Sequence, residues 1–456
     1  MGYLPVSFRS AANRRRPPHV HQRKLACGPL LLLGTVAASL VLTVVAGVHH
    51  PAHLGLSLAS TVTVRAAETS PGTSLRLGID RLLGDQFSLI AGKRVGLITN
   101  QTGRGRDGQH DADRLAADKR VQLVALFSPE HGFRGDEPPG AYVASYVDPV
   151  LHLPVYSLYG PTQRPTAAML RGIDVLLFDI QDVGSRYYTY ISTMAYALQA
   201  AAQYQIPIIV LDRPNPIGGQ QVEGPVLEPA YQSFVGLYPI PVRHGMTIGE
   251  LARLFNEEFG IHAPLTVVPM EGWTRSTWWD QTGLPWVKPS PNMTSPQTAL
   301  VYPGTCLLEG TNVSEGRGTA RPFETLGAPW IDGTRLANAL NALRLPGVRF
   351  EPVRFVPTTS KYQGEACEGV QLEVTDRLGF ASVRTGLWII ATIERLYPQQ
   401  FRFNQSAGQY YFDTLIGNGR IRPALQRGEN PDTILAPFQA AVDRFIAVRS
   451  RYLLYP

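Results

Sequence analysis

Short apolar runs alternate with helical patterns in the first half of the chain, and this alternation limits its fold more than any other feature. Four runs are rich in β-branched and aliphatic side chains, which predicts buried strands: residues 94–99, 121–127, 174–178 and 207–211. Helical patterns at 111–119 and 188–204 lie between them. Strands that are apolar on both faces and joined by helices form parallel sheets covered on both sides. We therefore predict an α/β fold with a mostly parallel sheet.

Polar residues follow each of the four runs. They occupy residues 100–101, 128–131, 179–182 and 212–215. In an open parallel sheet a ligand binds outside the carboxyl ends of the strands. We therefore expect the four strand ends to converge on one cleft.

The length of the chain predicts two domains. One core usually supports about 100–200 residues, and the chain has 456. We assign residues 1–66 to an export leader or membrane anchor with a linker, 75–232 to the sheet domain and 233–456 to a second domain. Within the last, Thr247 and Glu250 match a capping box that opens a helix at 248–259, which predicts a structural role for Glu250.

An uncharged apolar segment at residues 29–48 follows a basic stretch near the N-terminus. Such a segment is typical of an export signal, and at about 1.5 Å per residue its length also suits a membrane anchor. The basic side stays in the cytoplasm. Either alternative predicts that the body is extracytoplasmic, whether secreted, periplasmic or anchored facing outward.

This leader also carries the positive charge of the chain, which is +6 overall. Residues 1–67 hold seven of the 42 basic residues and none of the 36 acidic ones, which leaves 35 basic and 36 acidic side chains in the body. A nearly neutral body offers no basic face, so we expect no nucleic-acid partner.

The cysteines, histidines and glycines do not predict a cofactor site. Cys306 and Cys367 are the cysteines of the body, and both a disulfide and two buried free thiols fit them. No two body histidines have metal-ligand spacing. Residues 103–108 match a dinucleotide-binding glycine pattern, but a flexible polar loop fits equally well, and three residues separate the strand from the first glycine. We expect neither a metal nor another cofactor.

Glu130 is the first candidate catalytic group. It lies on a strand-end loop between Phe127 and Phe133, and apolar neighbours favour the protonated form that a general acid needs. The alternative is a carboxylate that caps a turn or pairs with Arg134.

Asp179 and Asp182 are the second candidates, because they precede Arg186 and three tyrosines at the start of a helical pattern. This combination fits a polyol-binding wall, and it also fits an acidic helix entry. Further on, the Pro- and Gly-rich loops at 212–219 and 222–225 either position a ligand or turn corners. His244 either binds a ligand or satisfies a buried carbonyl, and tryptophans at 273–286 either stack on sugars or fill a core.

Long motifs in the chain resemble those of the NamZ-type exo-β-N-acetylmuramidases. They are RVGLITNQTG (94–103), LFSPEHGFRGD (126–136), GIDVLLFDIQDVGSRYYTYISTM (172–194), LDRPNPIGG (211–219), VEGP (222–225), RHGMTIGELA (243–252), TGLPWVKPSPNM (282–293) and YPGTCLLEGTNVSEGRGT (302–319). The resemblance runs from about residue 75 to the C-terminus. Thr294, where a proline is expected, is a minor departure.

The resemblance implies an exported bacterial glycosidase that releases non-reducing-end N-acetylmuramic acid from peptidoglycan fragments. It implies a Rossmann-like domain and a smaller C-terminal α/β domain with the active site in the cleft between them. The catalytic glutamate of the family falls on Glu130. The partners would be peptidoglycan-derived disaccharides and glycan ends.

On this basis we expect hydrolysis of a β-1,4 bond with Glu130 as general acid. Asp179, Asp182 or the 2-acetamido group of the substrate would act opposite it, and Arg186 and Arg213 would bind the lactyl carboxylate of muramic acid. The predicted substrate-binding residues are Asn100, His131, Arg186, Tyr190, Arg213, Asn215, Glu223, His244, Asn292, Asn312 and Glu315.

Two other functions stay open. A non-catalytic cell-wall binding protein could use the same cleft. An exported esterase or amidase lacks its sequence signature, because the chain has no G-x-S-x-G nucleophile motif.

Overall fold

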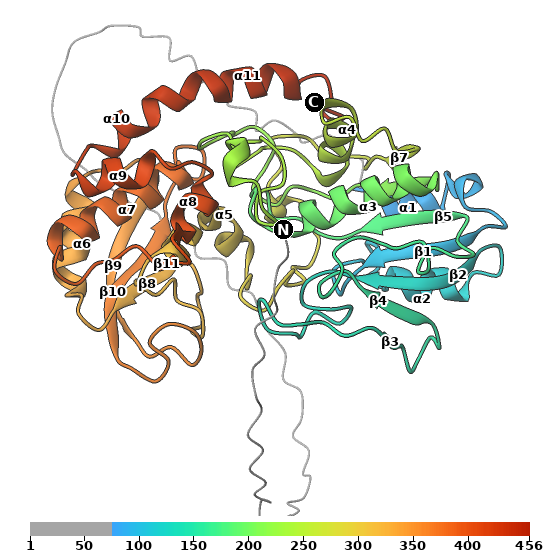
Figure 1. Cartoon of the computed structure of the whole chain (residues 1–456), viewed down its shortest axis with the longest axis horizontal. Helices are drawn as coiled ribbons and strands as arrows, with labels where there is room; N and C mark the ends of the chain where they lie inside the picture. The colour runs from blue at the N-terminus through green and yellow to red at the C-terminus, as the bar shows by residue number, and fades with distance from the viewer. Residues whose placement is uncertain (1–74) are drawn as a thin grey trace, which may run out of the picture. The chain divides into compact units, whose positions relative to one another are not determined.

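A seven-stranded sheet forms the centre of the N-terminal part of the protein (Figure 1). The computed structural model describes residues 75–456. The strands are β1 (Arg94–Thr99), β2 (Gln122–Ser128), β3 (Tyr146–Val147), β4 (Pro154–Ser157), β5 (Val175–Asp179), β6 (Ile208–Leu211) and β7 (Leu265–Val268). Their order is β3-β4-β2-β1-β5-β6-β7, and every neighbouring pair is parallel except β3 with β4. The predicted α/β fold is confirmed, and the four predicted strands match β1, β2, β5 and β6 to within one residue.

Helices cover both faces of this sheet. They are α1 (Gly78–Leu83), α2 (Asp111–Ala117), α3 (Tyr190–Tyr204) and α4 (Ile248–Glu258). Leu176 and Phe178 of β5 share a core with α3 and α4, whereas the alternate residues Val175 and Leu177 share a second core with α1 and α2. Successive side chains of a strand point to opposite faces, so the apolar run of β5 fills both cores at once.

The capping box of α4 is present as predicted. Thr247 Oγ1 accepts from the Glu250 backbone N–H at 3.2 Å, and Glu250 Oε2 accepts from the Thr247 N–H at 3.0 Å. Glu250 is fully buried and pairs with Arg275 at 2.7 Å. Its role is therefore structural, because its oxygens are used within the fold.

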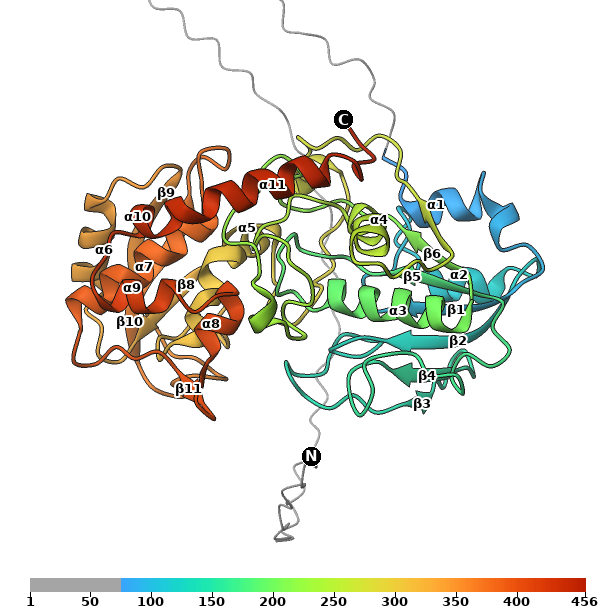
Figure 2. The ribbon, with the colours of Figure 1, turned by 45° about the horizontal axis from the view of Figure 1, so that its top comes forward.

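The C-terminal part contains a three-stranded antiparallel sheet of order β8-β10-β9, which Figure 2 shows beside its helices. Its strands are β8 (Thr325–Ala328), β9 (Val348–Phe355) and β10 (Cys367–Val374), and a two-residue pair, β11 (Gln405–Ser406) and β12 (Gln409–Tyr410), follows them. The helices are α5 (Pro296–Thr305), α6 (Gly333–Ala342), α7 (Ser382–Leu396), α8 (Tyr411–Ile416), α9 (Ile421–Gln426), α10 (Pro431–Leu435) and α11 (Gln439–Arg449).

Helices α5 and α7 cross at two glycines. A Cβ atom on Gly304 would lie 1.9 Å from the Ser382 carbonyl oxygen, and one on Gly386 would lie 2.3 Å from the Gly304 carbonyl oxygen. Both distances are too short for any side chain, so the crossing requires glycine at both positions. It holds α5, and the loop after it, close against α7.

The two parts share one hydrophobic core that includes Met194 of α3, Leu300 of α5 and Ile390 of α7. Strand β7 pairs with β6 in parallel, so the large sheet continues past residue 232. The domain boundary placed there stays a prediction.

The predicted leader and its apolar segment at 29–48 lie outside the described residues. Within residues 75–456 the longest helices are too short or too polar to cross a membrane. The choice between a cleaved signal and an anchor stays open.

The C-terminal tail docks on the large sheet through a buried carboxylate. Asp212, directly after β6, is fully buried and accepts from Thr247 Oγ1 at 2.8 Å, from the Gly249 N–H at 2.8 Å and from the Tyr455 hydroxyl. The Tyr455 oxygen in turn accepts from the Met270 N–H at 2.8 Å. Burial raises the pKa of Asp212 to about 7, and the Tyr455 hydroxyl opposes that shift.

We expect Tyr455→Phe to destabilise the protein more at pH 8.5 than at pH 5.5. The raised folded pKa of Asp212 means that its contribution to stability is complete below about pH 4, the unfolded pKa, and is lost as pH rises through about 7. Above pH 7 the tyrosine donates to a buried anion, which is worth about 1.5–3 kcal/mol, whereas a neutral partner is worth about 1 kcal/mol. Urea unfolding at the two pH values measures the difference. Tyr452→Phe, whose hydroxyl bonds to Glu258 near the surface, is the control; an equal loss at both pH values would contradict the expectation.

Candidate active site

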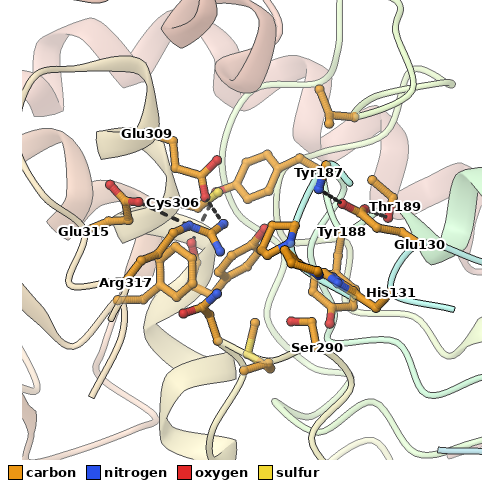
Figure 3. A pocket seen from close by; sticks show the side chains of 18 of the residues that line it. Glu130, His131, Tyr187, Tyr188, Thr189, Ser290, Cys306, Glu309, Glu315 and Arg317 are labelled. Atoms are coloured by element: carbon orange, nitrogen blue, oxygen red, sulfur yellow. Dashed lines mark hydrogen bonds and ion pairs between the residues drawn. The ribbon is translucent and has the colours of Figure 1, made fainter. Parts of the chain in front are cut away.

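A cavity of about 770 Å³ lies between loops of the large sheet and the C-terminal part. The sheet side contributes Glu130 and His131 from the loop after β2, and residues 187–190 from the loop between β5 and α3. The opposite side contributes Glu309, Glu315, Arg317 and Lys361. Figure 3 shows Glu130 and His131 on one side and Glu309, Glu315 and Arg317 on the other. The prediction that four strand ends converge on one cleft is therefore wrong: of the four polar stretches only residues 128–131 line the cavity, and the loop after β5 reaches it farther on, through residues 187–190.

Glu130 is held at the N-terminus of α3. Its Oε2 accepts from Thr189 Oγ1 at 2.7 Å, and its Oε1 accepts from the Gly140 N–H at 3.0 Å (Figure 3). Thr189 is the N-cap residue of α3, so the positive end of the helix dipole also faces this carboxyl group. The alternative partner Arg134 pairs instead with Asp148 at 2.8 Å, which leaves Glu130 to the cavity.

His131 follows in a left-handed backbone conformation, with φ of 71°. Its Nδ1 lies 2.7 Å from the Glu137 carbonyl oxygen. A carbonyl only accepts, so Nδ1 carries the proton, and in the neutral ring Nε2 is then an acceptor. Burial lowers the pKa of His131, which keeps the ring neutral at pH 7. The side chain therefore presents a lone pair beside Glu130.

Tyrosines form the floor between the two charged sides. The hydroxyls of Tyr187 and Tyr190 donate to the backbone carbonyls of Pro303 and Pro289. The Tyr188 hydroxyl has no hydrogen-bond partner within residues 75–456. Burial and the neighbouring Glu130 carboxylate raise the pKa of Tyr159 to about 12, so Tyr159 is a neutral hydroxyl next to Glu130.

Four charged side chains form the opposite side; Glu315 is buried, and Glu309, Arg317 and Lys361 are half-buried. Arg317 Nη2 donates to Glu309 Oε1, and Nε lies 3.2 Å from Glu315 Oε1. Lys361 Nζ lies 3.0 Å from Glu315 Oε2. Burial, together with the Glu315 carboxylate, raises the pKa of Glu309. Although burial acts against the charged form of Arg317, the two glutamates raise its pKa, so it stays a cation.

Asp179 does not reach the cavity. Its carboxylate is fully buried at the end of β5 and pairs with Arg213, whose Nη2 lies 3.4 Å from Asp111. Arg213 also donates to the Arg104 carbonyl at 2.9 Å. Burial, followed by the Asp179 charge, raises the pKa of Asp111 well above its usual range. We predicted that Asp179 acts on the substrate and that Arg213 binds the carboxylate of the substrate. Neither prediction fits this location, because the two buried charges neutralise each other.

Asp182 and Arg186 are also internal. Asp182 Oδ2 accepts from the Gly184 N–H at 2.8 Å and lies 3.4 Å from His244 Nε2, and His244 is fully buried. The Arg186 guanidinium donates to the carbonyls of Pro225, Ile240 and Leu415 at 2.7–2.9 Å. These three predicted site residues hold loops together below the cavity and do not line it.

The remaining predicted binding residues divide in the same way. Tyr190, Asn292 and Glu315 line the cavity with His131. Four others bind groups within the fold and do not line the cavity. Asn100 bonds to Thr102, and Asn215 bonds to the Met246 carbonyl. Glu223 pairs with Arg243, and Asn312 bonds to the backbone of Gln400 and Arg402.

Other sequence alternatives are decided by packing. The Gly105 N–H donates to the Gln109 carbonyl and the Gly108 N–H donates to the Gly105 carbonyl. These donors of the glycine loop are therefore used within the loop. Cys306 and Cys367 are buried free thiols. Trp273, Trp278 and Trp279 are buried away from the cavity.

Sequence reasoning missed Tyr159, Thr189, Glu309, Arg317 and Lys361. Thr189 fell inside the helical pattern predicted at 188–204, so the sequence did not mark it as the N-cap that it is in α3. Glu309 and Arg317 belong to the motif at 302–319. The sequence of that motif does not indicate that these two side chains face the loop that carries Glu130. Lys361 had no sequence signal, since it lies in a loop between β9 and β10.

Comparison with known proteins agrees with this architecture. The family model for the N-terminal domain of exo-β-N-acetylmuramidase NamZ matches residues 95–297, and the model for the C-terminal domain matches residues 300–455. The chain belongs to the NamZ family. The resemblance inferred from the motifs is therefore confirmed, and the two family models meet within the first half of α5, between residues 297 and 300.

Relatives within the NamZ family are similar over nearly their whole length. A peptidoglycan β-N-acetylmuramidase NamZ of Bacillus subtilis (strain 168) is 51% identical over 88% of this chain and 98% of its own. Two DUF1343 family proteins of Bacteroides fragilis NCTC 9343 have crystal structures similar to this one. One has a TM-score of 0.79 and is 39% identical, and the match covers 85% of this chain and 100% of its own. The other has a TM-score of 0.68 and is 32% identical, and the match covers 84% of this chain and 99% of its own.

We expect Asp179→Asn to cost about 3 kcal/mol of unfolding free energy, because the change leaves Arg213 buried with a weakened partner. Chemical denaturation measures the loss. Asp174→Asn, which removes an exposed pair with Arg94 just before the same strand, should cost clearly less. Equal stability of the Asp179 variant and the wild type would show that the buried pair does not stabilise the sheet.

Proposed function

We propose that this protein is an exo-β-N-acetylmuramidase that releases non-reducing-end N-acetylmuramic acid from peptidoglycan fragments. In this reaction the β-1,4 bond to N-acetylglucosamine is hydrolysed. The name and 51% identity of the Bacillus subtilis relative support the activity. The observation that carries the proposal is a single carboxyl group, Glu130, held on the cavity wall by two hydrogen bonds.

The size of the cavity supports action on short substrates. At about 770 Å³ it falls within the range of about 300–1,000 Å³ that is typical of small-molecule sites. A chain end of one or two sugar rings suits this volume better than a long glycan does.

Glu130 would protonate the oxygen of the leaving sugar. A general acid must be held in place in both protonation states, and the Thr189 hydroxyl can do this because it donates to a carboxylate and accepts from a carboxylic acid. The Gly140 N–H always donates, so it holds Oε1 as an acceptor and leaves Oε2 as the oxygen that carries the proton.

The group that acts opposite Glu130 is not Asp179 or Asp182, because neither lines the cavity. Glu309 and Glu315 are both paired with cations. The acetamido group of the substrate, or a water molecule that gives its proton to the lone pair of His131 Nε2, would then attack the anomeric carbon as Glu130 protonates the leaving oxygen. Water activated by His131 would invert the anomeric configuration, whereas the acetamido group would retain it, so NMR of the first product separates them.

The site of action would be outside the cytoplasm. The basic stretch and apolar segment at 29–48 support export. Its substrate class, peptidoglycan fragments, would be met there.

We expect Glu130→Gln to lower kcat by about 10³-fold, because an amide cannot supply the proton and general acid catalysis contributes about 10²–10⁴-fold. The measurement is release of muramic acid from N-acetylmuramyl-β-1,4-N-acetylglucosamine. Glu137→Gln, on the same loop but exposed, is the matched control and should keep wild-type turnover.

Two different results would contradict the proposal. Turnover by Glu130→Gln at the wild-type rate would remove Glu130 as the acid. Binding of the disaccharide by the wild type with no monosaccharide product would instead favour a non-catalytic wall-binding protein.

A further inference from the structure

Among the residues that the structure describes, a single cationic group on the wall opposite Glu130 is free to bind a ligand. Two cations, Arg317 and Lys361, are among the described residues that line the cavity. The arginines first considered for an anion, Arg186 and Arg213, are sealed in the interior by carbonyls and by Asp179.

Lys361 has no donor left. Its ammonium lies 2.8 Å from the Leu308 carbonyl oxygen, 2.9 Å from the Val313 carbonyl oxygen and 3.0 Å from Glu315 Oε2. An ammonium has three N–H groups, so these three acceptors use them all. Lys361 therefore fixes the loop at 308–315 and neutralises Glu315.

Arg317 is fixed on one edge and free on the other. The edge formed by Nε and Nη2 faces Glu315 and Glu309, and the Phe323 ring lies 5.0 Å from the guanidinium carbon. Nη1 makes no hydrogen bond within residues 75–456, and it is not a buried atom. The end of the guanidinium formed by Nη1 and Nη2 therefore points into the cavity as two parallel N–H donors, which match a carboxylate plane.

The charges of the cavity define where an anion is accepted. On the Arg317 side two glutamates are balanced by two cations, so an approaching anion meets no net negative charge. On the Glu130 side the nearest ionisable groups are a carboxyl, a neutral histidine and Tyr159, which stays uncharged, so none of them attracts an anion.

We propose that Arg317 binds the free carboxylate of the lactyl group of the substrate and is the residue that makes the site prefer muramic acid over uncharged sugars. Glu309, Glu315 and Lys361 act as positioning residues that hold the guanidinium with its free end toward the substrate. The inference rests on the proposed function, since it assumes that the glycan end enters with its scissile bond toward Glu130.

The test compares three chromogenic substrates with the full-length protein. They are 4-nitrophenyl β-N-acetylmuramide, its lactyl methyl ester, and 4-nitrophenyl β-N-acetylglucosaminide. The ester keeps the shape of muramic acid but lacks the charge. We expect the wild type to prefer the acid over the ester by about 100-fold in kcat/KM, because the ester would displace water from the two donors without offering them a carboxylate.

Arg317→Gln should lower kcat/KM for the acid by about 100-fold and change that for the ester by less than about threefold, so that the preference disappears. Arg317→Lys keeps the charge without the fork, and we expect it to lose most of the preference. Because Arg317→Gln leaves Glu309 buried without its partner, the double variant Arg317→Gln with Glu309→Gln serves if the single variant does not fold. Arg354→Gln, which breaks an exposed pair with Glu368, is the control and should behave as the wild type.

The outcomes separate this proposal from the proposed function. Equal loss on acid and ester, or an unchanged preference, would overturn the role of Arg317 while leaving the muramidase activity in place. Hydrolysis of neither muramide by the wild type would overturn the proposed function. In that event calorimetric binding of N-acetylmuramic acid and its methyl ester still decides on Arg317: at least tenfold tighter binding of the acid, lost in Arg317→Gln, supports it, and equal binding overturns it.

Discussion

Alternate side chains of β5 pack against α3 on one face of the sheet and against α1 and α2 on the other. A parallel sheet exposes neither face to water, so each strand must be followed by a helix or a covering loop. The chain therefore leaves each parallel strand at the carboxyl edge of the sheet, where the loops that follow the strands lie. The loop after β2 that carries Glu130 and the loop after β5 that leads into α3 meet there. The N-cap of α3 consequently lies beside Glu130, and the candidate active site depends on this packing.

Charge burial separates the structural carboxylates from those that face the cavity. Asp179, Asp182 and Asp212 all follow strand ends, yet each is sealed from the cavity and satisfied by protein donors. Unpaired burial of such groups would cost several kcal/mol each, so the fold supplies Arg213, backbone N–H groups or Tyr455 for them. Glu130 differs because one side of its environment is open. Its two hydrogen bonds orient it without closing the cavity.

The C-terminal part completes the site. It shares one core with α3, and the Gly304–Gly386 crossing brings the chain after α5 close to α7. This chain supplies Glu309, Glu315 and Arg317, and the loop after β9 supplies Lys361. The cavity thus has Glu130 on one wall, and on the other two glutamates balanced by two cations, Arg317 and Lys361.

Periodicity and composition determined the parallel strands, the α4 capping box and a body of near-zero charge, because each is a local property of the chain. The family motifs likewise pointed to Glu130. What the sequence could not decide was which polar side chains after the strands would face a ligand, because Asp179 and Glu130 occupy equivalent positions in the pattern. Only the tertiary structure decided this. It placed Arg213, from the next strand end, against Asp179, and it brought Arg317, 187 residues away in the chain, to the wall opposite Glu130. Pairing of buried charges depends on which segments meet in space, and no local pattern records that.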